Sequence, residues 1–100
     1  MKIAIASTSK DEDAKVSPIS GRAEYYQIFE DKKLVKVIKN PFAVGGGGAG
    51  PAVAQMLANE NVEMIISGHF GEKMLAALEE KNIKIKTIQG KTVKEALEEA

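Results

Sequence analysis

The chain has 100 residues, of which 44% are hydrophobic, and this is enough for a single domain with one core over residues 1–100. Basic and acidic side chains number 14 each, so the chain lacks the overall positive field that nucleic-acid-binding and acidic-membrane-binding proteins use. The absence of cysteine excludes disulfides, thiolate-ligated zinc and a cysteine-held iron-sulfur cluster.

The first part of the chain is predicted to form three strands. Residues 2–6 are apolar and favour a strand, and a polar, turn-forming loop follows over 7–13. This apolar stretch is too short for a signal peptide or a membrane span, which favours a cytoplasmic protein. Residues 25–30 and 34–39 are rich in aromatic and β-branched side chains and have three polar residues between them, which predicts an antiparallel hairpin.

The next part is predicted to form a helix and a buried strand. Pro51 suits the first position of a helix, and apolar residues then recur at helical spacing to about Asn59. The nearly continuous apolar run over 62–67 is typical of a parallel strand that is covered on both faces.

The last part of the chain is predicted to form a helix, a strand and another helix. Met74, Leu75 and Leu78 share one face of a second predicted helix. Residues 83–87 alternate apolar or Thr side chains with lysine, which predicts an edge strand with one face exposed to water. Thr92 and its third neighbour Glu95 have the spacing of a capping box, so a third helix is expected to start there.

This order of elements predicts an α/β fold. A hairpin followed by right-handed strand-helix units gives a mixed five-stranded sheet, with an N-terminal antiparallel hairpin and helices on both faces.

Glycines crowd the segment that leads into the first predicted helix; they are Gly45, Gly46, Gly47, Gly48 and Gly50. Backbone without side chains lets a ligand approach closely, and the N–H groups at a helix start favour an anion. The run follows the third strand instead of the first, and Pro51 stands where a Walker motif has lysine, so neither nucleotide fingerprint is matched well. Two interpretations stay open, namely an anion-binding loop and a flexible connection.

His69 and Arg22 are the other candidate ligand-binding residues. His69 follows the fourth predicted strand, where open α/β sheets place ligand contacts, and its imidazole could ligate a metal, donate to an anion or shuttle a proton. Arg22 is the only arginine and could hold an anion with two hydrogen bonds. A structural histidine and a surface ion pair are the alternatives. We expect these two residues, the glycine run and the loop over 7–13 to bound one cleft.

Catalysis has no support in the sequence, and we expect a binding protein that is not an enzyme. One histidine, no cysteine and no signature around any serine leave no pair of nucleophile and base. The first and fourth strands also lack the clustered carboxylates of a two-metal nuclease.

A series of short motifs extends over nearly the whole chain. They are Ser17-Pro18, Gly21-Arg22-Ala23, Tyr26, Phe29, Asn40-Pro41, residues 47–50 and residues 67–71. In order and spacing they resemble the dinitrogenase iron-molybdenum cofactor biosynthesis family. The resemblance implies a ribonuclease-H-like three-layer fold and the binding or carriage of an iron-sulfur or iron-molybdenum-type cluster.

The resemblance also bears on the ligands. Members of the family often carry histidines where this chain has Ile19, Val44 and Gly45, and of the family's histidine positions only His69 is kept. His69 is therefore the metal ligand that the resemblance implies, with Arg22 and the glycine run as further cofactor-binding residues.

The expected function is that of a non-enzymatic binding or carrier protein for such a cluster or a related small anion, exchanged with a cluster-donor or acceptor protein. Three alternatives stay open. The chain could have lost cluster binding, it could be a regulatory domain that binds phosphate or a nucleotide through the glycine loop, or it could be an interaction module whose hairpin or edge strand pairs with another chain.

Overall fold

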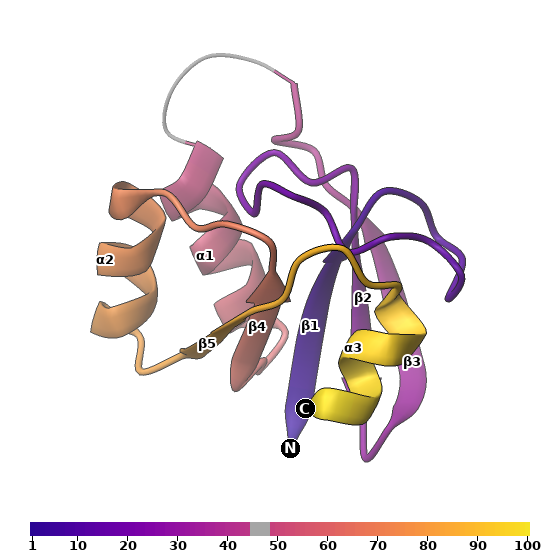
Figure 1. The fold of residues 1–100 in the computed structure, drawn as a ribbon. Coiled ribbons are helices and arrows are strands. Elements are labelled where there is room, and N and C mark those ends of the chain that lie inside the picture. Colours follow the sequence, from indigo (N-terminus) through magenta and orange to yellow (C-terminus); the bar gives the residue numbers. More distant parts are fainter. Residues whose placement is uncertain (45–48) are drawn as a thin grey trace.

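The structure is a computed structural model that describes residues 1–44 and 49–100 (Figure 1). Its elements, in chain order, are β1 (Lys2–Ser7), β2 (Tyr25–Glu30), β3 (Lys33–Lys39), α1 (Ala49–Asn59), β4 (Met64–Ser67), α2 (Glu72–Glu80), β5 (Lys84–Thr87) and α3 (Val93–Glu99). The predicted order of strands and helices is confirmed. Among the described residues no helix has the length and apolar character that crossing a membrane requires.

The strands form one mixed sheet in the order β3-β2-β1-β4-β5. β1, β2 and β3 pair antiparallel, whereas β4 pairs parallel with both β1 and β5. The hairpin is tighter than its three polar residues predicted, because Asp31 and Lys32 take φ angles of 50° and 67° and Lys33 already pairs with Glu30. A two-residue turn with positive φ matches the twist of the strands that it joins.

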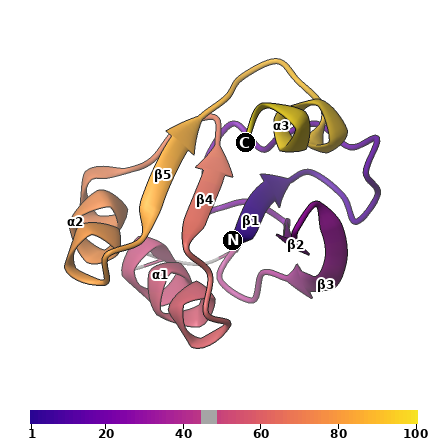
Figure 2. The same cartoon turned by 90° about the horizontal axis from the view of Figure 1, so that it is seen from below.

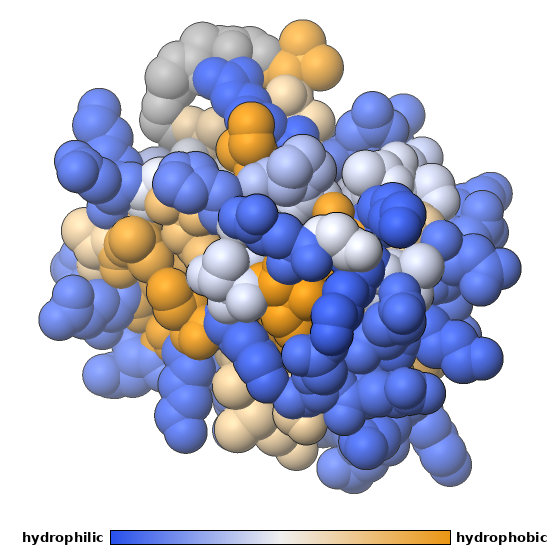
Figure 3. All heavy atoms as spheres, in the orientation of Figure 1, coloured by the Kyte–Doolittle hydropathy of each residue, from blue (hydrophilic) through white to orange (hydrophobic). Residues whose placement is uncertain are grey.

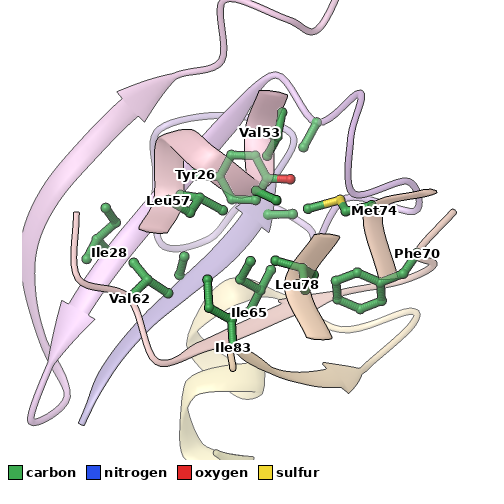
Figure 4. Close-up of a cluster of buried hydrophobic side chains, with 14 residues drawn as sticks. Tyr26, Ile28, Val53, Leu57, Val62, Ile65, Phe70, Met74, Leu78 and Ile83 are labelled. Carbon is green, nitrogen blue, oxygen red and sulfur yellow. The ribbon is translucent and has the colours of Figure 1, made fainter. Parts of the chain in front are cut away.

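The helices lie on both faces of the sheet (Figure 2). α1 and α2 cover one face, where Tyr26, Leu57 and Ile65 belong to the larger buried cluster (Figure 4). α3 covers the other face, where Val93 packs in a second buried cluster with Phe29. The predicted three-layer α/β arrangement is confirmed. β1 and β4 are largely buried, and for β4 the apolar run over 62–67 predicted this.

Two details of the helices differ from the prediction. α1 begins at Ala49, so Pro51 is its third residue and not its first; the first turn tolerates proline because its N–H groups have no partner within the helix. On α2, Met74 and Leu78 are buried, but Leu75 is 36% exposed. Within residues 1–44 and 49–100, β5 is the outermost strand on the side of α2, and apolar residues reach the surface over α2 and β5 (Figure 3).

The last strand and the last helix have the features that the sequence predicted. β5 is an edge strand, as predicted, and its Ile85 is 41% exposed. α3 starts with the predicted capping box, in which Thr92 Oγ1 accepts from the Glu95 backbone N–H and the Glu95 carboxylate accepts from the Thr92 N–H.

Candidate anion-binding pocket

A pocket of about 360 Å³ lies where the N-terminal ends of α1 and α2 come together. Ala49, Gly50 and Pro51 line it from α1. On the other side it is lined by Gly71, which precedes α2, and by residues 72–74 in the first turn of α2. The loop before β2 completes the wall with residues that include Arg22. Both helices follow sheet strands and start at the same end of the molecule (Figure 1). In open α/β sheets this end, beyond the carboxyl ends of the parallel strands, is where ligands bind.

Three backbone segments meet at the base of this pocket. A Cβ added to Gly50 would lie 2.9 Å from the Cβ of Met74, closer than real Cβ contacts. A Cβ added to Gly21 would lie 3.4 Å from the N and Cα of Gly50. Glycine at position 50 therefore lets the start of α1 touch the start of α2, and this contact brings the two helix ends to one pocket.

The loop before β2 is fastened to the end of β4. The Gly68 N–H donates to the Ser17 carbonyl at 2.8 Å, and the Ser20 N–H donates to the His69 carbonyl at 2.9 Å. A Cβ at Gly68 would be 2.8 Å from the Cα of Pro18, so this backbone contact also requires glycine. These bonds hold the loop that carries Arg22 against the strand that leads into α2.

Asn40 holds the same loop from the hairpin side. Its Nδ2 donates to the carbonyl oxygens of Gly21 at 3.2 Å and Ala23 at 2.8 Å, which are the residues on either side of Arg22. Its Oδ1 accepts from the Phe42 N–H at 2.9 Å, and the side chain is buried. One buried amide thus fixes the backbone around Arg22 and the start of the segment that leads to the glycine run.

A buried tyrosine of β2 also holds the loop that carries Arg22. The Tyr26 hydroxyl donates to the Ser20 carbonyl and lies 2.9 Å from the Ser20 Oγ. Burial raises the pKa of Tyr26, because an ionised phenol would lose its hydration inside the core. The neutral hydroxyl is thereby kept as a donor to the loop.

The electrostatics of the pocket favour a negative ligand. The N-terminal ends of two helices carry partial positive charge and N–H groups with no partner inside the helix. Arg22 and Lys73 add two cations, and Glu72 is the one carboxylate among the lining residues that the structure describes. No cluster of three or more His, Cys, Asp or Glu side chains suited to a metal ion occurs in residues 1–44 and 49–100. The pocket is therefore better suited to an anion than to a bare cation.

Comparison with known proteins identifies the family. The sequence matches the family described as dinitrogenase iron-molybdenum cofactor over residues 1–100. The chain belongs to this dinitrogenase iron-molybdenum cofactor family. No curated protein matches its sequence.

Solved structures of similar chains agree with this family. The apo form of the orange protein from Desulfovibrio gigas has 27% identity and a TM-score of 0.90, over 97% of this chain and 83% of that chain. A NifB-like protein from Thermotoga has 32% identity and a TM-score of 0.84, over 97% and 84%. A dinitrogenase-like protein from Methanocaldococcus jannaschii, at 23% identity, TM-score 0.65 and coverage of 97% and 84%, shows the fold alone.

The structure brings only part of the predicted cleft together. Arg22 and Gly50 both line the pocket. His69 is exposed and is not among the lining residues, although its carbonyl binds the loop that carries Arg22. The other candidate glycines, Gly45, Gly46, Gly47 and Gly48, lie outside the described residues.

The loop over 7–13 was wrongly expected to bound this cleft, because it packs beside α3. The Lys94 N–H donates to the Glu12 carbonyl at 3.2 Å, and the buried Gln27 donates through Nε2 to the Asp11 carbonyl at 2.8 Å. These bonds hold the loop against the face of the sheet that α3 covers, away from the pocket. Gln27 stands among aromatic and apolar residues of β2, and this was the sign in the sequence of a polar contact there.

Sequence reasoning missed the contribution of α2 to the pocket. Lys73 and the N–H groups that follow Gly71 belong to the start of this helix. Gly71 stands directly before the charged first turn of a predicted helix. Like Gly50, it is a glycine at a helix start, and this could have indicated a second helix end at the pocket.

Proposed function

We propose that this chain is a non-enzymatic binding or carrier protein for an anionic metal cluster of the iron-sulfur or iron-molybdenum type, which binds in the pocket between α1 and α2. The observation that carries the proposal is the convergence of two helix starts and two cations, Arg22 and Lys73, on one pocket. Membership of the dinitrogenase iron-molybdenum cofactor family supports a metal cluster as the anion. The relative from Desulfovibrio gigas, described in an apo form, is consistent with a group that can be bound and released.

The donor groups of the protein limit how such a cluster could be held. The chain has no cysteine and one histidine, so protein side chains cannot replace all the ligands of a cluster. The cluster would instead arrive as cargo with its own anionic ligands, and backbone N–H groups and the two cations would bind those outer atoms. We propose His69, exposed beside the loop that carries Arg22, as the one imidazole that could add a direct bond to metal.

Anaerobic reconstitution tests the proposal. The protein is incubated with ferrous iron and sulfide, with and without molybdate, then desalted and analysed for metal and visible absorption. Wild type should retain metal, and Lys73→Gln should retain several-fold less because one cation of the pocket is lost. Lys81→Gln is the matched control, since Lys81 caps the opposite end of the same helix. No retention by wild type, or equal retention by the Lys73→Gln variant, would overturn the proposal.

His69→Ala separates direct ligation from electrostatic binding. If His69 bonds to the metal, the variant should lose most of its cluster while its circular dichroism stays that of wild type. Some retention is expected to persist, because the helix N–H groups and Arg22 still bind an anion. Equal retention by wild type and variant would reject His69 as a ligand and leave the pocket proposal intact.

Phosphate is the second candidate ligand, because helix N–H groups and lysine or arginine bind phosphate by the same contacts. Thermal-shift measurements with phosphate, ATP and molybdate distinguish the two functions. Stabilisation by ATP that is lost in Lys73→Gln, together with no metal retention, would favour a nucleotide-binding regulatory domain. Stabilisation by molybdate with metal retention would favour the carrier.

A further inference from the structure

The outer side of β3 forms a second distinctive surface, far along the sheet from β5. β3 stands at one end of the strand order, and among the described strands it pairs with β2 alone. Both ribbon views place it at the end of the sheet (Figures 1 and 2). Six of its seven residues are exposed. Leu34, Val35 and Val37 are 42%, 51% and 37% exposed, so an unusually apolar strand faces water.

The hydrogen bonds of the hairpin show which backbone groups of β3 face outward. The Asn40 N–H donates to the Glu24 carbonyl at 2.9 Å. These two residues are the next pair along the ladder from Tyr25 and Lys39. Backbone groups alternate in direction along an antiparallel strand. Ile38 therefore points its N–H and carbonyl groups to β2, whereas Val37 and Lys39 point theirs away from the sheet.

The charge along this strand has one sign. Residues 32–39 contain four lysines and neither Asp nor Glu. Lys36 forms an ion pair with Glu60 at 2.8 Å. Lysines on an edge strand oppose pairing with a second copy, because like charges would face each other across the contact. They would favour a strand with carboxylates. Protection of the edge explains the lysines, but it does not explain three exposed apolar side chains between them.

We infer that β3 is a strand-addition site for an extended segment of a partner protein in which acidic and apolar residues alternate. The backbone of Val37 and Lys39 would pair with that segment, its carboxylates would lie near the lysines, and its apolar side chains would cover those of β3. The other sheet edge fits such a segment less well. β5 is only four residues long, and Lys86 on it already donates to the Glu99 carbonyl.

A synthetic heptapeptide of alternating Glu and Val tests the inference, with a Lys and Val heptapeptide as its control. Amide NMR spectra of the full chain should shift at Val37 and Lys39 with the acidic peptide only, and hydrogen exchange of these two amides should slow. Failure of the acidic peptide to bind, equal binding of both peptides, or shifts confined to β5 would overturn the inference. Self-association through β3 would overturn the choice of an acidic partner.

Two variants make the test specific to the backbone and the charge. Val37→Pro removes an outward N–H without removing a bond to β2, so binding should weaken about tenfold while the spectrum stays well dispersed. The double variant Lys33→Glu and Lys39→Glu tests the charge, and its result does not depend on whether the fold tolerates a proline in β3. It should lose the acidic peptide and gain the basic one, and unchanged preference would also overturn the inference.

Discussion

Gly50 on α1 and Met74 on α2 are in such close contact that a Cβ at the glycine would lie 2.9 Å from the methionine Cβ. The same added atom would be 3.2 Å from the Met74 backbone N. The flexible end of a side chain could move aside. The Cβ and backbone N of Met74 are fixed to the helix, so they cannot move unless α2 shifts. The spacing of the two helices at the pocket thus depends on one missing methyl group.

Gly50→Ala should lower the free energy of unfolding by roughly 1–2 kcal/mol, because overpacking outweighs the gain in helix propensity. Urea denaturation measures the change. Gly71→Ala is the matched control, since no atom lies within 4 Å of its added Cβ and its φ of −72° suits alanine. Because Gly71 is the N-cap of α2, where alanine is less favourable than glycine, its denaturation midpoint should fall slightly, by less than that of Gly50→Ala. A Gly50→Ala midpoint equal to that of the control would contradict the close contact.

Asn40→Asp should weaken anion binding as well as stability. The variant keeps the acceptor for the Phe42 N–H but loses the donor to the Gly21 and Ala23 carbonyls, and it places a carboxylate against them. Buried groups left without a partner cost roughly 1–3 kcal/mol each. Urea denaturation measures the stability, and metal retention by the folded fraction measures binding. Retention equal to wild type would show that Asn40 does not position Arg22 for binding.

Tyr26→Phe should lower stability at pH 7 by roughly 1–3 kcal/mol, because the Ser20 carbonyl and hydroxyl lose their buried partner. The pKa of Tyr26 is raised by burial, so its contribution is complete below the ordinary tyrosine pKa of about 10 and decreases as pH rises above it. The difference in unfolding free energy between wild type and variant should therefore narrow in alkaline solution. A difference that stays constant from neutral to alkaline pH would contradict a buried, neutral phenol.

The capping box of α3 predicts the opposite dependence on pH. The pKa of Glu95 is lowered, chiefly by the hydrogen bond from the Thr92 backbone N–H and then by that from the Thr92 hydroxyl. Its stabilising effect is therefore present above the ordinary glutamate pKa and is lost as pH falls through the lowered value. Wild type should exceed Glu95→Gln in stability at pH 7 but match it in acid, as measured by urea denaturation at each pH.

Thr92→Ala removes the other half of the capping box. It should cost about 1 kcal/mol, since the side chain accepts the Glu95 N–H at the helix start. Thr8→Ala is a suitable control, because Thr8 is an exposed threonine outside the helices with only a long 3.4 Å side-chain bond. An unchanged denaturation midpoint for the Thr92→Ala variant would show that Thr92 does not cap α3 in solution.

The features that the sequence predicted well depend on local spacing. Thr92 and Glu95 are one helical turn apart, so their pattern alone predicted the cap. The exposure of Leu75 instead depends on β5 being the last strand, which the helical pattern of α2 does not contain. The tight turn at Asp31 and Lys32 was missed because Lys32 stands where such a turn usually has glycine.

The candidate site was predicted in part for the same reason. Arg22 was found because it is the only arginine, and Gly50 because it belongs to the glycine run before the first predicted helix. Lys73 was not, because lysine is common in the chain and only the contact between Gly50 and Met74 brings the start of α2 to the pocket. The loop over 7–13 was misplaced because its position depends on Gln27, a residue 16 positions from its partner Asp11.

The bond from the Ser67 hydroxyl to the Ser17 carbonyl joins residues 50 positions apart, beside the bond that Gly68 makes to the same oxygen. A chain fragment that ends before β4 therefore cannot assemble the pocket, however well its hairpin folds. Cargo that binds only the assembled pocket would be linked to global unfolding, and at one hundred times its dissociation constant it would add about 2.7 kcal/mol to the stability of the entire domain. Loss of cargo would then raise the fraction of unfolded chains, so the supply of the ligand would set how long the protein survives proteolysis.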